Sequence, residues 1–158
     1  LGDIVGVYET TVQPGQATVR LIAEPGAGFR TLGRDGPLGQ VFRNLIDNAR
    51  SFSPPGGEVR VRLERDPADA GRLLVMVEDD GPGIPPDNLE TVFERFYTSR
   101  PRGTAFGANS GLGLSIVRQI VVAHGGAVRA VNRQADDGGV AGARFEVVLP
   151  AVGGGRRP

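Results

Sequence analysis

The sequence predicts an α+β fold in which helices cover one face of a largely antiparallel sheet. Two observations support this prediction. Segments with helical spacing of apolar residues alternate with segments of strand character, and most predicted strands are joined by turns of hairpin length. A parallel doubly wound domain would instead need a long crossover between successive strands. At 158 residues, the chain is long enough for one domain with a substantial core.

The predicted helix at residues 41–53 organises the rest of the chain. It follows Gly36-Pro37, ends at a Pro-Pro-Gly-Gly stretch, and turns an apolar stripe inward. Asn44 and Asn48 are four residues apart at the margin of that stripe, so they lie on the same side of the helix. Buried amides need partners, so this pair indicates either a polar ligand or metal on this face, or ordinary hydrogen bonds at the helix surface.

The other elements follow from periodicity and turn residues. Residues 58–65 alternate apolar and charged, which predicts a strand with one solvated face, so we interpret Arg60 and Arg62 as surface residues. Residues 73–77 are continuously apolar and are predicted to form the central strand. The remaining predictions are strands at 17–24, 29–32, 127–132 and 143–149, hairpin turns at 67–71 and 136–142, and helical segments at 1–11, 87–97 and 111–123.

Two glycine-containing loops are candidates for ligand binding. Asp79 follows the central strand and precedes Gly81 and Gly83, so its carboxylate could accept a hydrogen bond from a flat ligand that the backbone approaches closely. The alternative is a plain turn. Residues 109–115 lead into a helix, and the free N–H groups there favour an anion, although a hinge is the alternative. Residues 98–110 lack periodicity and are predicted to be a mobile loop.

Composition excludes several classes of function. Eighteen basic residues balance eighteen acidic ones, so neither a nucleic-acid partner nor an anionic membrane surface is favoured. The chain has no cysteine and no apolar run long enough to insert into a membrane. Its single histidine, His124, is at a helix end, where a capping role is expected.

Several motifs occur together in an order that resembles the ATP-binding domain of sensor histidine kinases, within the group that includes gyrase, Hsp90 and MutL. The motifs are NLIDNARSFSP, VEDDGPGIP, VFERFY, NSGLGLSIVRQIVVAHGG and GARFEVVLP. The resemblance covers about residues 38–150. It implies the Bergerat fold, a two-layer α/β sandwich with a mixed, mostly antiparallel sheet. We expect this domain at residues 1–152 and a disordered tail at 153–158.

The resemblance also implies roles for individual residues. Asn48 would offer its amide oxygen to Mg²⁺, which prefers oxygen ligands, and Asn44 would face the phosphates of ATP. Asp79 would accept the exocyclic amine of adenine. The residues expected beside the base and sugar are Gly81, Gly83 and Phe52.

At the phosphate end of the implied site, the chain departs from the family pattern. Gly111, Leu112 and Gly113 would shape the loop that closes over the phosphates, with residues 98–110 as a lid. The basic residues common in the family are replaced by Ser51 and Thr98, and Asn109 replaces a glycine. Phosphate charge would then be neutralised by an arginine; the candidates are Arg95, Arg100 and Arg102.

Position 44 separates the possible activities. Hydrolysing members of the group carry glutamate there, whereas the amide of Asn44 cannot act as a general base. The resemblance therefore implies a histidine kinase catalytic domain that transfers the γ-phosphoryl group of Mg·ATP to a histidine absent from this chain. The alternatives are a hydrolysing ATPase and a degenerate nucleotide-binding or docking module.

The same resemblance implies partners and location. A histidine-bearing dimerisation domain of the same protein and a response regulator would be the partners. The domain would be cytoplasmic, as part of an inner-membrane sensor protein. The segments ARSFSP and NSGLGLS resemble those of ChvG-type kinases of alphaproteobacteria.

Overall fold

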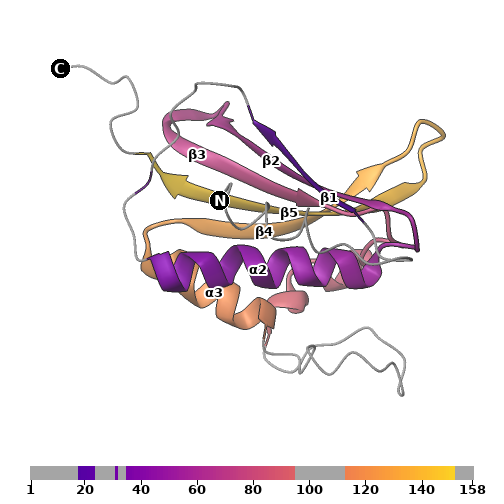
Figure 1. The fold of residues 1–158 in the computed structure, drawn as a ribbon, viewed down its shortest axis with the longest axis horizontal. Helices are drawn as coiled ribbons and strands as arrows, with labels where there is room; N and C mark the ends of the chain where they lie inside the picture. Colours follow the sequence, from indigo (N-terminus) through magenta and orange to yellow (C-terminus); the bar gives the residue numbers. More distant parts are fainter. Residues whose placement is uncertain (1–17, 24–30, 32–34, 95–112, 152–158) are drawn as a thin grey trace.

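The computed structural model describes residues 18–23, 31, 35–94 and 113–151, and these form two layers (Figure 1). One layer is a five-stranded sheet in the order β1-β2-β3-β5-β4. The strands are β1 (Thr18–Ala23), β2 (Glu58–Asp66), β3 (Asp69–Glu78), β4 (Ala127–Gln134) and β5 (Val140–Pro150). β1 pairs with β2 in parallel, and the other neighbours are antiparallel. The mixed, mostly antiparallel α+β fold is therefore confirmed, with β3 at its centre.

The second layer contains two helices, which lie on the same face of the sheet (Figure 1). These are α2 (Asp35–Phe52) and α3 (Gly113–Ala123); the short 3₁₀ turns η1 (Pro86–Asn88) and η2 (Thr91–Phe93) precede α3. The apolar stripe predicted for α2 is fully buried at Leu45 and Ile46. It packs in one cluster with Val117 of α3 and Phe145 of β5. Burial of this stripe fixes which side of α2 remains available to a ligand.

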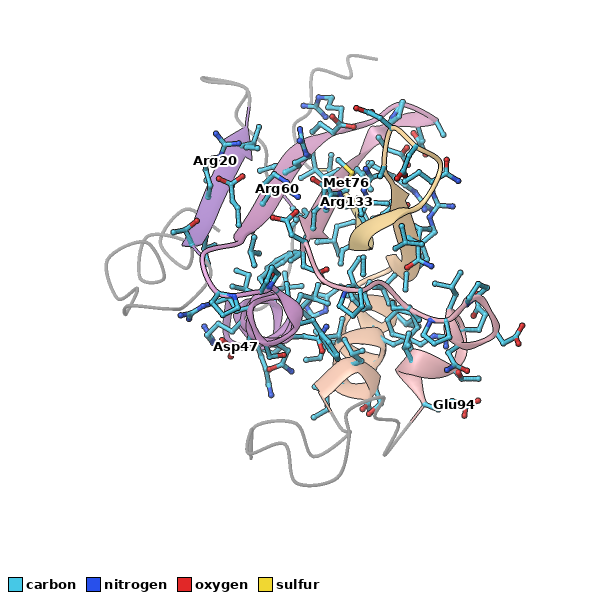
Figure 2. The ribbon with its side chains drawn as sticks, turned by 90° about the vertical axis from the view of Figure 1, so that its right-hand side faces the viewer. Arg20, Asp47, Arg60, Met76, Glu94 and Arg133 are labelled. Atoms are coloured by element: carbon cyan, nitrogen blue, oxygen red, sulfur yellow. The ribbon has the colours of Figure 1, made fainter. Side chains whose placement is uncertain are left out.

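The outward face of the sheet differs from the prediction. The side chain of Arg60 is only 12% exposed, and its Nη2 lies 2.7 Å from Asp80 Oδ1. Arg62 is 42% exposed and donates to Glu78. Interpreting both arginines as solvated surface was wrong for Arg60, because alternation shows which face a residue is on but not whether acidic neighbours cover it. Figure 2 shows Arg60, Met76 and Arg133 on the sheet and Asp47 on the far side of α2.

Two hairpins are tighter than predicted, so their strands are longer. Asp66 pairs with Asp69, which reduces the predicted turn at 67–71 to Pro67 and Ala68. In the second hairpin, the turn is closed by a hydrogen bond from Ala135 N to Gly139 O, so β5 begins before the predicted residue 143. The helix expected at 1–11 and the tail at 153–158 lie outside the described residues. Of the strand expected at 29–32, only Thr31 is described, and it belongs to no strand.

Candidate functional site

One face of α2 carries three half-buried residues at four-residue spacing: Asn44, Asn48 and Phe52. Residues four apart on a helix lie one above the other, and eight residues span about 12 Å along the axis. The neighbouring stripe, including Leu45 and Ala49, is fully buried. The core therefore fixes the orientation of this row of two amides and one aromatic ring, which we call the α2 row.

Gly113, the first residue of α3, contacts the N-terminal end of the α2 row at Asn44. Asn44 Nδ2 donates a hydrogen bond to the backbone oxygen of Gly113, with an N–O distance of 3.4 Å. Asn44 Nδ2 is also the nearest atom to the position that a Cβ on Gly113 would occupy, at 4.0 Å. The structure thus brings Asn44 of the asparagine motif next to Gly113 at the start of α3.

The loop that follows β3 contacts the C-terminal end of the α2 row at Phe52. A Cβ on Gly81 would lie 2.6 Å from the carbonyl oxygen of Phe52, so glycine is required for this close approach. The backbone N–H of Asp80 donates to Ser53 Oγ at 3.4 Å. Phe52 and Gly81, which the sequence places in one site, are therefore adjacent in space.

Asp79 lies at the end of β3 and is 2% exposed. Its Oδ1 accepts hydrogen bonds from the N–H groups of Gly81, at 2.8 Å, and Ala143, at 3.0 Å. Burial raises the pKa of Asp79 above its ordinary value, and these two N–H groups and the charge of Arg133 oppose that shift. Both backbone hydrogen bonds fall on Oδ1, so the carboxylate has a fixed orientation.

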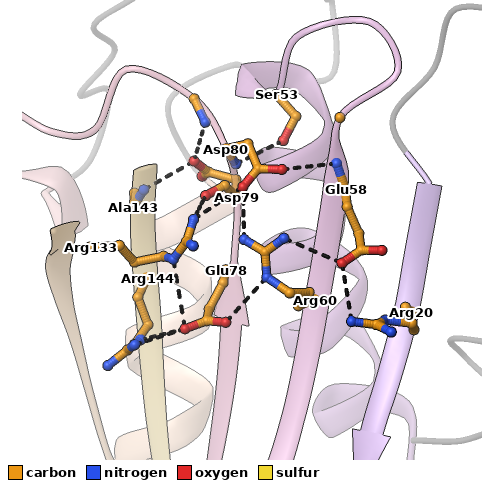
Figure 3. Close-up of polar contacts among 12 residues, drawn as sticks. Arg20, Ser53, Glu58, Arg60, Glu78, Asp79, Asp80, Arg133, Ala143 and Arg144 are labelled. Atoms are coloured by element: carbon orange, nitrogen blue, oxygen red, sulfur yellow. Dashed lines mark hydrogen bonds and ion pairs between the residues drawn. The ribbon is translucent and has the colours of Figure 1, made fainter. Parts of the chain in front are cut away.

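A network of ion pairs lies behind Asp79 on the outward face of the sheet (Figure 3). The side chain of Glu78 is 3% exposed and accepts hydrogen bonds from Arg62 and Arg144, each at 2.8 Å. Burial alone would raise the pKa of Glu78, but these guanidinium groups outweigh it and the pKa lies below its ordinary value. Asp80 is bound in the same way by Arg60 and Arg133.

The donor set suits a magnesium nucleotide better than a metal held by the protein alone. Among the described residues, no group of three His, Cys, Asp or Glu could hold a metal ion. Asn48 nevertheless has an amide oxygen on the α2 row, and Mg²⁺ commonly takes few protein ligands while phosphates and water complete its shell. The residues therefore fit an ion that arrives with the nucleotide.

Several of the predicted site residues lie outside the part of the chain that the structure describes. They include Gly111, Leu112, Arg95 and Arg100, and the expected lid also lies outside the described residues. His124 Nδ1 lies 2.8 Å from the oxygen of Ile120, which confirms its role at the end of α3.

Three residues of the β4–β5 hairpin contact the Asp79 loop but were not predicted as site residues: Asn132, Arg133 and Ala143. They are 48 to 64 residues distant in sequence from the groups they bind. No motif covers Asn132 or Arg133, and Ala143 lies in GARFEVVLP without a predicted role in the site. Their contribution follows from the pairing of β3 with β5 and of β5 with β4.

A mixed sheet covered on one face by two helices, with polar side chains converging between the helices and a strand end, defines an α+β domain with a candidate ligand site at that edge. The chain belongs to the family described as histidine kinase-, DNA gyrase B- and HSP90-like ATPases, which matches residues 33–153. Within this family it corresponds to the catalytic ATP-binding domain of sensor histidine kinases, as its relatives show.

Two curated relatives illustrate the similarity. The chain is 52% identical over 128 residues to the sensor protein ChvG of Rhizobium meliloti, covering 80% of this chain and 22% of that protein. It is 44% identical over 123 residues to the signal transduction histidine-protein kinase/phosphatase MprB of Mycolicibacterium smegmatis, covering 78% of this chain and 24% of that protein. The chain thus spans about a quarter or less of the length of these relatives.

Solved structures agree with this assignment. The mycobacterial sensor histidine kinase MprB superposes with a TM-score of 0.76 and 35% identity, over 95% of this chain and 93% of that one. Full-length ShkA in complex with AMPPNP superposes with a TM-score of 0.76 and 25% identity, over 96% of this chain and 29% of that one. Among the described residues, neither α2 nor α3 has the length and apolar character of a membrane-spanning helix.

Proposed function

We propose that this chain binds Mg·ATP along the α2 row and transfers its γ-phosphoryl group to a histidine on a dimerisation domain of the same protein. One observation carries the proposal. The α2 row meets Gly113 at one end and the Asp79–Gly81 loop at the other, so groups suited to phosphates and groups suited to a base lie at opposite ends of one surface.

The Asp79 end suits adenine. The carboxylate is buried, and its Oδ1 is held by two N–H groups. Oδ2 would then accept the exocyclic amine of the base, a donor that guanine lacks at the equivalent position. Phe52 would pack against the base, and Gly81 and Gly83 would let the base and sugar approach the backbone.

The Asn44 end suits phosphates. Asn44 and Gly113 lie beside the N-terminus of the eleven-residue helix α3, where free N–H groups and the helix dipole favour an anion. Asn48 would contribute its amide oxygen to Mg²⁺, which neutralises phosphate charge when bound. Gly111 and Leu112 would complete the loop over the phosphates, and Arg95 or Arg100 would supply positive charge.

Catalysis would rest on position and charge rather than on a base in this chain. Asn44 is a neutral amide that already donates to a carbonyl, so it cannot take a proton from water. The chain would therefore hold ATP with little hydrolysis until the accepting histidine is aligned with the γ-phosphorus. The phosphoryl group would then pass to a response regulator, and the domain would act in the cytoplasm.

The test is to supply γ-labelled ATP to this chain alone and to a longer protein in which the histidine-bearing dimerisation segment is attached. We expect label on the histidine of the longer protein and slow phosphate release by the chain alone. Steady phosphate release by the chain alone would support a hydrolysing ATPase instead. No labelling despite binding of ATP would support a nucleotide-sensing module.

A further inference from the structure

We propose that Asn132 and Arg133, adjacent on β4, are positioning residues that hold the Asp79–Ile84 loop from both faces of the sheet and so set nucleotide affinity and base selectivity. The inference rests on the proposed nucleotide site and adds two residues to it. We call the contacts of these two residues with residues 79–84 the loop clamp.

Asn132 holds the far end of the loop. Its Oδ1 accepts from the backbone N–H of Ile84 and its Nδ2 donates to the backbone oxygen of Ile84, both at 2.7 Å. This two-point pairing fixes both the position and the direction of the peptide. The fit is close, because a Cβ on Gly83 would lie 2.8 Å from Asn132 Oδ1 and 2.5 Å from Val140 Cγ1.

Arg133 holds the near end. Its Nη1 donates to the backbone oxygen of Asp79 at 2.6 Å and lies 3.1 Å from Asp80 Oδ1 (Figure 3). The same carbonyl lies against Gly142, where a Cβ would overlap it. Asp79 is thus held through its carbonyl by a guanidinium group while its carboxylate is held by the N–H groups of Gly81 and Ala143.

The two residues act from opposite faces of the sheet. Successive side chains of a strand point to opposite faces, and Ala130, two residues before Asn132, belongs to the core beneath the helices. Asn132 is therefore on the helix side. Arg133 is on the outward side, where its Nε lies 3.9 Å from Glu78 Oε2.

The loop clamp fixes the position of the Asp79 carboxylate in the proposed site. A carboxylate that distinguishes bases must be fixed to within a few tenths of an ångström, and a loop is fixed only by what holds its backbone. The neighbouring charges also act on Asp79, because Arg133 favours its ionised form against the effect of burial. Loss of the loop clamp should therefore weaken ATP binding and also reduce preference for ATP over GTP, whereas a general loss of stability would not change that preference.

The experiment is calorimetric titration of Mg·ATP and Mg·GTP into the wild type, Arg133→Met, Arg133→Lys and Asn132→Ala. The matched control is Arg129→Met, on the same strand and face, because Arg129 is paired with Glu146. Arg133→Met loses the hydrogen bonds from Nη1 to Asp79 O and to Asp80 Oδ1, so we expect roughly tenfold weaker ATP binding and a smaller ATP-to-GTP ratio. Arg133→Lys should recover part of the ATP affinity and part of the preference for ATP over GTP. Arg129→Met should match the wild type in both quantities.

Equal ATP affinity and an equal nucleotide ratio in Arg133→Met and Arg129→Met would overturn the inference. Should Arg133→Met fail to fold, the ATP affinity and the ATP-to-GTP ratio of Asn132→Ala and Arg133→Lys test the inference in its place. Amide exchange at Ile84 tests the loop clamp without nucleotide: it should be faster in Asn132→Ala than in Arg129→Met, and equal rates would contradict the proposal. If the wild type binds no ATP, the proposed function is wrong. The amide exchange experiment needs no nucleotide, so it still tests the loop clamp in that case.

Discussion

Asn44 on α2 donates its side-chain N–H to the backbone oxygen of Gly113, the first residue of α3. Sixty-nine residues separate the two in sequence. The contact joins the helix that carries both amides to the point where the glycine-rich loop becomes a helix. Any nucleotide bound between these elements would meet Asn44 and the N-terminus of α3 together.

This contact predicts the effect of Asn44→Asp. The carboxylate would lose the donor to Gly113 O and would add a negative charge where phosphates are expected, so ATP affinity should fall by about tenfold or more. Calorimetric titration with ATP measures the change. The control is Asp47→Asn, on the exposed side of α2. Equal ATP affinity in Asn44→Asp and wild type would mean that phosphates do not lie at this end of the row.

Asn48→Ala should remove the dependence of ATP binding on Mg²⁺ and leave the fold intact. Asn48 is half-buried, and the neighbouring core residues Leu45 and Ala49 are untouched by the change. Titrations with and without Mg²⁺ should differ in the wild type and coincide in the variant, while the thermal midpoint changes little. A variant that keeps the full magnesium effect would exclude Asn48 as a ligand.

Asp79→Asn should weaken adenine recognition. The amide oxygen can still accept both backbone hydrogen bonds at the Oδ1 position, but the N–H₂ group would face the amine of the base, so two donors would oppose each other. We expect ATP affinity to fall by about tenfold or more and the preference over GTP to shrink. Asp87→Asn, at an exposed position of η1, is the control. If Asp79→Asn binds ATP as tightly as the wild type, the role assigned to this loop is wrong.

The ion pairs of Glu78 predict how stability depends on pH. Because its pKa is lower in the folded protein than the ordinary value of 4.5, the unfolded chain takes up its proton first as pH falls. The stability that Glu78 contributes is therefore fully present above pH 4.5 and is lost below it. Asp79 acts in the opposite sense, because its raised pKa means that ionising it in the folded protein costs stability as pH rises.

Urea unfolding at several pH values tests this assignment with Glu78→Gln. The variant should be less stable than the wild type at neutral pH, because Arg62 and Arg144 lose a buried carboxylate partner. The difference should shrink below pH 4.5, where the wild type loses the same charge. A difference that stays constant through that range would show that the charge of Glu78 does not stabilise the fold.

Local sequence patterns predicted the parts of the fold that depend on periodicity. The apolar spacing of α2 and the alternation of β2 each follow from which residues must be buried, so the helix, the strand and their inward faces were predictable. The placement of Asn44 beside Gly113 and of Phe52 beside Gly81 followed from the order of the motifs in the family rather than from periodicity.

The contacts that the sequence did not reveal are all long-range. The alternation of β2 predicts that Arg60 is a surface residue, yet Asp80, which follows β3, pairs with it and covers it. Asn132 and Arg133 carry no local signal, because their function depends on β4 and β5 folding back beside the loop after β3. Pairing between distant strands is set by the whole sheet, so such residues become visible only in three dimensions.

The most direct test of the central claim is calorimetric titration of the folded domain with a non-hydrolysable ATP analogue, with and without Mg²⁺. Circular dichroism would first establish that the sample is folded. A single site per chain with clearly tighter binding when Mg²⁺ is present is the result that the geometry of Asn44, Asn48 and Asp79 predicts. Absence of binding heat from the folded protein at any magnesium concentration would contradict it.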